Sequence, residues 1–401
     1  MQENPVIVIG AGPVGLVTAL SLAQNGIPVR VFEAERGPVE DQRGAAFHPP
    51  TLEMLSSLGI VDELKPLGVV VPVWQIRDRD EGVIASFDLS VLADETPFPY
   101  RFHLGQHLII PVLLKRLCAY SHASVHFSCR AMAVRQDSDS VTVTVESPTG
   151  FECHKGNWLV GADGGRSTIR KDAGIAFDGY TWPEHFVVNN LTSDIEALGL
   201  ALTNYVTTPD SWAVVLKLSE IEEAPLWRVT YPIEGQEVDE AALNNTTIER
   251  RFVEFLPGLG EHVVRHTAIY RVHQRVAQTF RRGRILLAGD AAHINNPLGG
   301  FGLNSGIHDA FSLSRKLISI WRGESRDDAL DRYVAERRHA NLAYIQASSI
   351  RNKKVLEERD PASRRAAHEE LRRIADIPEL TKRYLMNSSM ISSIRDAARF
   401  A

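Results

Sequence analysis

The chain opens with a hydrophobic pattern that is typical of an α/β fold. Residues 6–9 are a β-branched apolar run, residues 16–23 have the length and composition of a buried helix, and a glycine-rich hexapeptide separates the two. A second apolar run at residues 29–32 ends in Glu33. Short, fully apolar strands alternating with helices are typical of a parallel sheet. The pattern therefore predicts a strand–turn–helix–strand unit, the first unit of a doubly wound sheet.

The remainder of the chain shows three kinds of pattern. Apolar residues recur at helical spacing in residues 51–64 and 107–120, whereas residues 72–100 and 180–270 alternate as strands do. From residue 323 onward the chain is rich in Arg, Glu and Ala, which favours helices. We therefore expect a discontinuous α/β domain, a β-sheet domain inserted into it, and a helical C-terminal region. The expected bounds are 1–72, 101–178 and 268–322 for the first, 73–100 and 179–267 for the second, and 323–401 for the third.

Composition and charge exclude some classes of partner. The 401 residues include 44 Lys and Arg against 50 Asp and Glu, a formal net charge of −6, whereas nucleic-acid binding favours a basic surface. We expect no nucleic-acid partner. Cys118, Cys129 and Cys153 form neither a disulfide framework nor a metal-ligand spacing. No metal site is predicted, and a reducing, cytoplasmic location is expected.

The uncharged run at residues 6–23 approaches the length of a membrane span. However, Gly10, Gly12, Pro13 and Gly15 interrupt it, and the four residues before the run carry no positive charge. A strand, a glycine turn and a helix explain the run better, so we expect no stable membrane association.

The hexapeptide at residues 10–15 has the pattern GxGxxG. In this pattern the first glycine permits a tight turn, the second lets the backbone approach a pyrophosphate, and the third lets the helix pack on the strand. The N-terminus of the helix stabilises the anion. Glu33 follows the second strand, where an acid would hold a ribose hydroxyl. The motif predicts a dinucleotide site but leaves NAD and FAD open.

Two later segments also predict a strand that is followed by a glycine turn. Residues 158–161 predict a strand that leads into Asp163-Gly164, and residues 284–288 predict a strand that leads into Gly289-Asp290. A glycine-rich stretch at residues 297–306 then begins a helix. A carboxylate at a strand end accepts hydrogen bonds from a polyol, and helix N-terminal amides face electron-rich groups.

In order and spacing, these three motifs resemble those of the FAD-dependent aromatic hydroxylases, the single-component flavoprotein monooxygenases related to p-hydroxybenzoate hydroxylase. The resemblance covers roughly residues 5–320, and the chain is similar to the short members without a thioredoxin-like C-terminal domain. It implies an α/β fold class, with a Rossmann-like FAD-binding domain, an inserted β-sheet substrate domain and a helical C-terminal tail.

The resemblance also implies which residues contact FAD. Leu303 and Asn304 would offer backbone amides to the isoalloxazine ring, and Asp290 would lie on the ribityl or pyrophosphate side. Asp163 is associated in the family with both FAD and the nicotinamide cofactor. The full set implied at FAD is Gly10, Gly12, Pro13, Val14, Gly15, Glu33, Ala34, Arg43, Gln106, Asp163, Asp290, Pro297, Gly300, Gly302, Leu303 and Asn304.

The implied reaction is hydroxylation of a small aromatic or N-heteroaromatic substrate. NADH or NADPH would reduce FAD transiently, and O2 would form a flavin C4a-hydroperoxide in a dry pocket. Consistent with a visiting nicotinamide, no second GxGxxG follows a strand, because Ser305 stands where a third glycine would fall. A flavin halogenase or prenyl-chain reductase on the same fold, or a non-catalytic flavin-binding protein, are the alternatives. A halogenase would usually show WxWxIP, of which only Trp227 is present.

Three residues are candidates for catalysis. Pro297 corresponds to a proline whose carbonyl meets the substrate hydroxyl in the hydroxybenzoate enzyme. His48 would be an acid–base group near the ring, or else part of the loop structure. Tyr231 would reach the substrate from the inserted sheet, or else fill its core. His293 is expected to be structural or to contact flavin. The C-terminal helices are expected to be solvated, with a homodimer interface as the alternative.

Overall fold

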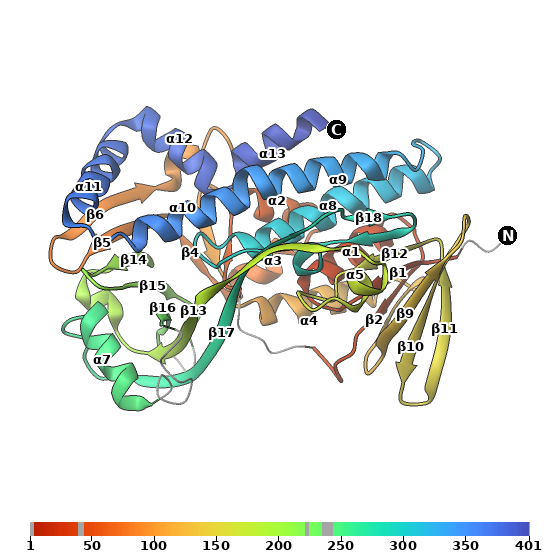
Figure 1. The fold of residues 1–401 in the computed structure, drawn as a ribbon, viewed down its shortest axis with the longest axis horizontal. Coiled ribbons are helices and arrows are strands. Elements are labelled where there is room, and N and C mark those ends of the chain that lie inside the picture. The colour runs from red at the N-terminus through yellow and green to blue at the C-terminus, as the bar shows by residue number, and fades with distance from the viewer. Residues whose placement is uncertain (1–3, 39–43, 221–223, 235–243, 401) are drawn as a thin grey trace.

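A six-stranded sheet carries the N-terminal strand–turn–helix–strand unit. The computed structural model describes residues 4–38, 44–220, 224–234 and 244–400 (Figure 1). Neighbouring strands are parallel except for the edge pair β18–β19. In spatial order they are β18 (Arg281–Arg282), β19 (Ile285–Leu287), β12 (Trp158–Gly161), β1 (Val6–Ile9), β2 (Val29–Phe32) and β8 (Ala123–His126). The glycine-bordered strands β1, β12 and β19 are thus adjacent.

Three helices pack beside this sheet and bury its apolar strands. Helix α1 (Pro13–Gln24) packs against both α4 (Gln106–Leu117) and α8 (Phe301–Trp321). The strands β1, β12 and β19 are buried along their whole length. Burial of such apolar surface is the main favourable term in folding. Among the described residues, no helix is both long and apolar enough to cross a membrane.

An eight-stranded, largely antiparallel sheet forms the second layer. Its order is β20 (His293–Ile294), β17 (Val263–Ala277), β13 (Phe177–Thr192), β16 (Leu226–Ile233), β15 (Trp212–Lys217), β14 (Thr203–Thr207), β5 (Val73–Asp78) and β6 (Gly82–Asp88). Strand β5 pairs in parallel with β14, which joins the two strand-like stretches of the sequence in one sheet. One face packs on α7 (Asn245–Phe255), and the other faces the C-terminal helices.

Two three-stranded sheets complete the β structure. Strands β3 (Ala46–Phe47), β7 (Arg101–His103) and β4 (Val69–Val71) pair antiparallel, with β7 in the centre. Strands β9 (Arg130–Gln136), β10 (Val141–Ser147) and β11 (Gly150–Gly156) form an antiparallel meander at one end of the molecule (Figure 1). The connecting helices and turns are α2 (Pro49–Ser57), α3 (Val61–Leu64), η1 (Lys65–Leu67), η2 (Leu89–Leu92), α5 (Thr168–Asp172), η3 (Ile195–Leu198) and η4 (Gly289–Ala291).

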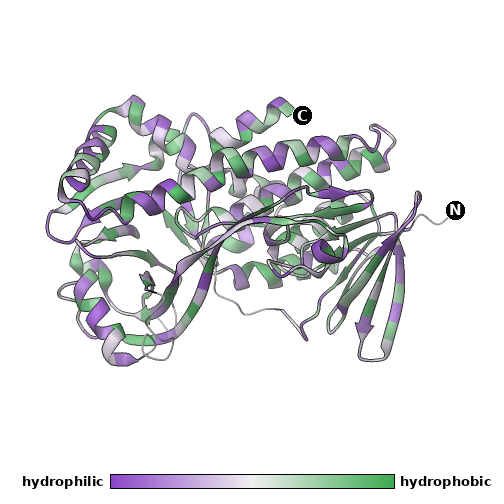
Figure 2. Ribbon diagram, in the orientation of Figure 1, coloured by the Kyte–Doolittle hydropathy of each residue, from purple (hydrophilic) through white to green (hydrophobic). Residues whose placement is uncertain are grey.

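The C-terminal region is helical, as its composition predicts. A long rod crosses the molecule and consists of α9 (Ala329–Ala340), a π-helical turn at η5 (Asn341–Gln346) and α10 (Ala347–Leu356) (Figure 1). It is followed by α11 (Pro361–Asp376), α12 (Pro378–Ser388), α13 (Ile391–Ala397) and η6 (Ala398–Phe400). Polar and apolar residues alternate along these helices (Figure 2), as expected where one side packs and the other meets water.

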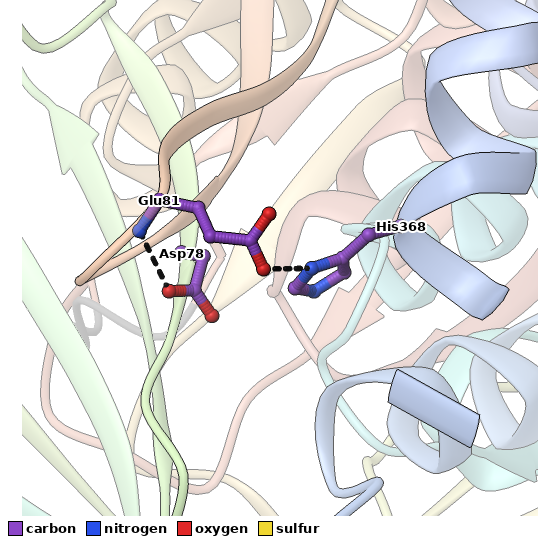
Figure 3. A group of neighbouring side chains, drawn as sticks. All are labelled: Asp78, Glu81 and His368. Atoms are coloured by element: carbon purple, nitrogen blue, oxygen red, sulfur yellow. Dashed lines mark hydrogen bonds and ion pairs between the residues drawn. The ribbon is translucent and has the colours of Figure 1, made fainter. Parts of the chain in front are cut away.

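Ion pairs attach α11 to the β5–β6 hairpin of the large sheet. Arg364 pairs with the buried carboxylate of Asp78, and Arg372 contacts Glu81 at 2.5 Å. The Nδ1 atom of His368 lies 3.1 Å from Glu81 (Figure 3). These contacts hold a helix from the end of the chain against a hairpin nearly 300 positions earlier.

The α/β class, the inserted sheet and the helical tail agree with the sequence predictions. The proposed domain boundaries are less sharp in the structure, because β13 and β17 each continue across a predicted boundary, at 178/179 and 267/268. These two long strands pair with each other along most of their length. A pair of continuous strands therefore links the part of the chain around the six-stranded sheet to the eight-stranded sheet.

Gly179 lies where the two long strands approach each other closely. Its φ angle is +135°, and a Cβ atom there would lie 2.0 Å from the carbonyl oxygen of Gln274. We expect Gly179→Ala to lower the free energy of unfolding by at least about 2 kcal/mol, because it adds both a strained backbone and a clash. Thermal unfolding measures this. Gly260→Ala is the matched control, because a Cβ there meets nothing within 4 Å. Equal melting temperatures for the two variants would contradict the prediction.

Candidate active site

The GxGxxG turn is closely packed at its first and third glycines and open at its second. A Cβ atom at Gly10, whose φ is +105°, would lie 2.4 Å from the carbonyl oxygen of Ala162. At Gly15 it would lie 2.0 Å from the carbonyl oxygen of Gly10. At Gly12 it would meet nothing within 4 Å. The first and third glycines therefore serve packing within the chain, and the second leaves space for a ligand.

Val14 is the point at which three distant segments meet. A Cβ atom at Gly289, in the Gly-Asp turn, would lie 2.9 Å from the Val14 side chain. One at Gly306 in α8 would lie 2.6 Å from Val14 and 3.2 Å from the Gly289 Cα atom. The Asp-Gly turn packs against the first glycine of the GxGxxG turn, because a Cβ atom at Gly10 would lie 3.2 Å from the Cα atom of Asp163. The glycine-bordered bends therefore lie together in space.

The N-termini of α1 and α8 both lack a capping side chain. Their N-cap residues are Gly12 and Gly300, and neither supplies a side-chain hydrogen bond. The first amides of a helix have no partner within the helix, and the helix dipole makes this end favourable for anions and electron-rich groups. Leu303 and Gly302 lie in the first turn of α8, where the resemblance places the flavin ring.

The Asn304 side chain holds the loop beside that ring position. Its Oδ1 accepts a hydrogen bond from the His48 backbone amide at 2.8 Å, and its Nδ2 donates to the carbonyl oxygens of Ala46 at 2.7 Å and Gly300 at 2.6 Å. Gln106 acts similarly on Gly44, accepting from its amide at 3.2 Å. Arg43, which precedes Gly44, lies outside the described residues.

The carboxylates implied at FAD differ in their surroundings. Glu33 accepts hydrogen bonds from the amides of Ala11 at 2.7 Å and Glu35 at 2.9 Å, so it holds the glycine turn. Asp163 accepts from the Ser167 hydroxyl at 2.5 Å and the Ile169 amide at 3.1 Å, and burial raises the pKa of Asp163. Asp290 is exposed on η4. Ala34 is half-buried just beyond β2, and Pro13 is the first residue of α1.

These features fit a dinucleotide with a flavin ring. Two uncapped helix ends suit a pyrophosphate and a ring edge, and the space at Gly12 suits close approach of a phosphate. Near Gly302, the buried Oδ1 atom of Asn295 has no hydrogen-bond partner among the described residues and lies 3.8 Å from where a Gly302 Cβ would be. An unpaired buried acceptor at that place suits a ligand that donates a hydrogen bond.

A row of buried polar side chains faces the large sheet from the small β3–β7–β4 sheet. Ala46 pairs with His103 and Phe47 with Phe102, so His48 follows opposite Arg101. Because side chains alternate along strands, the two phenylalanines face the flavin-domain core, and His48, Arg101 and His103 share the other face. We call these three residues the polar shelf.

His48 is a neutral hydrogen-bond acceptor on this shelf. Its Nε2 donates to the carbonyl oxygen of Gly299 at 2.8 Å, and its buried Nδ1 has no partner among the described residues. A carbonyl oxygen only accepts, so Nε2 carries the proton and Nδ1 has a free lone pair. Burial, reinforced by the charge of Arg101, lowers the pKa of His48 to about 3.

His103 links the polar shelf to the large sheet. Its Nδ1 donates to the carbonyl oxygen of Lys217 at 2.8 Å, and its Nε2 lies 3.1 Å from the Thr203 hydroxyl. Burial lowers the pKa of His103 to about 4. On the facing strands, the Nε of Arg228 donates to Asn190 Oδ1 at 3.0 Å. The shelf is thus enclosed between two sheets.

Two of the three candidate catalytic residues, Tyr231 and Pro297, make contacts within the chain. Tyr231 is fully buried on β16 and packs with Phe255 in the core on the α7 side of the sheet. Its neighbours in sequence, Arg228 and Thr230, point the other way, so we leave Tyr231 out of the site. The carbonyl oxygen of Pro297 accepts a hydrogen bond from the Gly300 amide at 3.0 Å, within the turn that precedes α8.

His293 belongs to a buried ion network. Its Nε2 lies 2.6 Å from Asp309, and Arg337 contacts the other oxygen of that carboxylate at 2.7 Å. Burial alone would raise the pKa of Asp309, but His293 and Arg337 outweigh it and hold that pKa below its ordinary value. Asp309 also accepts from the Gly289 amide at 3.0 Å. The network therefore fixes the Gly-Asp turn, and the structural interpretation of His293 fits it.

Sequence reasoning missed Arg101, His103, Asp309 and Arg337. A signal existed for the first two, because they alternate on a short strand directly before the Gly105-Gln106 segment. No local signal exists for Asp309 and Arg337, whose pairing depends on how α8 and α9 pack.

A cluster of titratable side chains and a cavity lie outside this site. Asp78, Glu81 and His368 are close enough to hold a metal ion (Figure 3), but Arg364 and Arg372 already neutralise their carboxylates. A cavity of about 680 Å³ between β15, β16 and the end of α10 shares no lining residue with the glycine bends or the polar shelf. The polar shelf therefore remains the candidate site, because its buried polar groups adjoin the loop that Asn304 holds.

Taken with the fold, this arrangement defines a FAD-dependent aromatic hydroxylase. The chain belongs to the FAD binding domain family, whose family model matches residues 3–348. It is 38% identical to para-nitrophenol 4-monooxygenase of Pseudomonas sp. strain WBC-3, over 90% of this chain and 89% of that protein. It is 33% identical to 6-hydroxy-3-succinoylpyridine 3-monooxygenase HspB of Pseudomonas putida strain S16, over 90% and 91%.

Solved structures agree with this assignment. The crystal structure of p-nitrophenol 4-monooxygenase PnpA from Pseudomonas putida DLL-E4 superposes with a TM-score of 0.92 at 33% identity, covering 98% of each chain. Aklavinone-11 hydroxylase, solved with FAD and aklavinone, superposes with a TM-score of 0.77 at 26% identity, over 89% of this chain and 70% of that one. The chain is therefore an enzyme, a flavoprotein monooxygenase.

The glycine turn yields a prediction that separates ligand binding from folding. We expect Gly12→Ala to fold normally but to bind FAD at least about tenfold more weakly, about 1.4 kcal/mol, because the added methyl occupies the ligand's space. Gly15→Ala should lose stability instead, because its methyl meets the Gly10 carbonyl. FAD titration and thermal unfolding measure the two effects. Wild-type FAD affinity in Gly12→Ala would refute the assignment.

His48 yields a prediction for acid stability. The pKa of His48 is about 3 in the folded chain against 6.5 ordinarily, so the unfolded chain binds the proton first. Stability should therefore fall as pH drops from 6.5 toward 3, with His48 contributing a slope of up to about 1.4 kcal/mol per pH unit. His48→Gln, which cannot titrate, should reduce this slope by that amount. Denaturant unfolding at several pH values measures it, and an unchanged slope would show that His48 is not buried and neutral.

Proposed function

We propose that this FAD-dependent enzyme uses NADH or NADPH and O2 to hydroxylate a small phenolic ring. The observation that carries the proposal is the convergence of the three glycine-bordered bends beside the enclosed polar shelf of His48, Arg101 and His103. Reduced FAD activates O2 for insertion into an electron-rich ring. The relatives named for p-nitrophenol and for a hydroxylated pyridine support a small hydroxylated ring as the substrate.

In this proposal the chain holds the ring, orients its hydroxyl and excludes water. The free lone pair of His48 Nδ1 accepts the hydrogen bond of the substrate hydroxyl, which directs electron density into the ring. Its low pKa keeps His48 unprotonated throughout the working range. Burial of the shelf between two sheets keeps out the water that would compete with the ring for activated oxygen.

The residues around the cofactor would take roles that follow from their positions. Gly12, Val14 and the N-terminus of α1 take the pyrophosphate, and the first-turn amides of α8 at Gly302 and Leu303 face the ring edge. Asp290, on its exposed turn beside Gly289, takes the ribityl chain. The enzyme would work in the cytoplasm, in keeping with its free cysteines Cys118, Cys129 and Cys153.

A substrate screen tests the function directly. Purified protein should be yellow, and NAD(P)H oxidation should rise at least about tenfold with a matching phenol, with hydroxylated product formed in proportion. Nitrophenols, hydroxybenzoates, aminobenzoates and hydroxypyridines form the panel, and a peroxide assay exposes uncoupled turnover. His48→Gln should retain FAD while its product yield per NAD(P)H falls. Protein that binds FAD but responds to no ring in the panel would count against the proposal.

A further inference from the structure

Arg101 is a buried cation without an anionic partner among the residues that the structure describes. Only 3% of its surface is exposed, and its buried Nε has no hydrogen-bond partner. Across the described ranges 4–38, 44–220, 224–234 and 244–400, no residue forms a hydrogen bond or ion pair with its guanidinium. The guanidinium lies over the ring of Trp74, whose centroid is 4.6 Å from the Arg101 Cζ.

Other buried arginines in this chain show what such a group normally requires. Arg337 pairs with Asp309 at 2.7 Å, and Arg170 donates to the carbonyl oxygens of Ala291 at 2.8 Å and Gly165 at 2.9 Å. A buried charge without compensating bonds is strongly unfavourable. Arg101 departs from this pattern, so its position calls for an anion that arrives with a ligand.

The described residues around Arg101 supply no negative charge. His48 and His103 share its face of the polar shelf, and burial lowers the pKa of both, so both are neutral. Tyr384 belongs to the aromatic cluster of Trp74 and Phe87 beside Arg101. Burial raises the pKa of Tyr384 to about 12, so its hydroxyl stays protonated. Every titrating neighbour therefore leaves the positive charge of Arg101 unbalanced at neutral pH.

The same surroundings suit a flat ring. Trp74 stacks on Phe87 with 4.6 Å between centroids, and Tyr384 stacks on Phe87 at 4.7 Å. Tyr205 meets the Trp74 ring edge-on at 5.6 Å. Arg101 thus lies between an aromatic wall and His48, which contacts the Gly299 carbonyl in the turn before α8.

We propose that Arg101 binds an oxyanion of the aromatic substrate, either a carboxylate substituent or, in a ring that binds ionised, the phenolate oxygen in place of the hydroxyl that a neutral ring presents to His48. The inference rests on the proposed function, because it concerns the same substrate. A guanidinium presents paired donors in one plane, which match two coplanar oxygens, and it also stabilises a phenolate. The enzyme therefore selects anionic rings over neutral rings of the same shape.

Matched ligand pairs test the selection without turnover. Isothermal titration calorimetry on the FAD-loaded protein compares 4-hydroxybenzoate with 4-hydroxybenzamide, which differ in charge but hardly in shape. In a second arm, 4-nitrophenol is compared with 4-nitroanisole, which cannot ionise. Wild type should bind at least one anionic member at least about tenfold more tightly than its neutral partner. A preference in the first arm assigns the substituent, and a preference in the second assigns the ring oxygen.

Variants then attribute the preference to Arg101. In Arg101→Met the preference should disappear, with the neutral ligand bound within about threefold of wild type and FAD content unchanged. Arg101→Lys keeps the charge but loses the planar fork, so it should retain part of the preference. Arg135→Met, an exposed arginine on β9, is the matched control and should behave as wild type.

The outcomes separate this inference from the proposed function. Equal affinity of wild type for charged and neutral members, or failure to bind any of the four, overturns the inference without reference to any variant. A preference that survives in Arg101→Met also overturns it. If Arg101→Met does not fold, Arg101→Lys decides instead. The inference is then overturned if Arg101→Lys loses affinity equally for charged and neutral ligands, so that the wild-type preference is kept in full. Selective binding without any NAD(P)H oxidation would reject the proposed function and leave the role of Arg101 standing.

Discussion

Close backbone approach at the glycine bends is the constraint on which the rest of the structure depends. The Val14 side chain fills the space left by Gly289 and Gly306, and Gly10 lies directly against the Ala162 carbonyl. A methyl group at any of these three glycines would push apart segments that are separated by more than a hundred positions in sequence. Because the bends meet here, the N-termini of α1 and α8 lie on one side of the sheet and can serve a single extended cofactor.

A buried ion network supports this meeting point from behind. Asp309 receives hydrogen bonds from the Gly289 amide and from His293 and Arg337, so one carboxylate ties the Gly-Asp turn, strand β20 and helix α9 to α8. A buried carboxylate is stable when it is paired and hydrogen-bonded, as Asp309 is. The network therefore helps to fix the orientation of α8, and with it the position of its first-turn amides.

The fold was predictable where a constraint was local in sequence. The strand, turn and helix at residues 6–23 and the two later glycine turns are each specified by a few consecutive residues, and the structure has all three. The face of the sheet to which a strand residue points is not specified by a few consecutive residues, because it depends on register and on what covers each face. The sequence therefore leaves Tyr231 open between the substrate and the sheet core, and in the structure it packs under α7. Arg101 and His103 were missed because their importance appears only when β7 pairs with β3 and faces the large sheet.

Helix α12 contributes to the proposed substrate side of the molecule, whereas α9 supports the proposed cofactor side through Arg337. Tyr384 from α12 completes the aromatic wall around Arg101, yet it lies beyond residue 348, where the match to the family model ends. The glycine bends lie wholly within the matched part. Replacement of residues beyond residue 348 can therefore reshape the proposed ring site while the glycine bends stay intact, which gives evolution a way to change what is oxidised without rebuilding the means of oxidation.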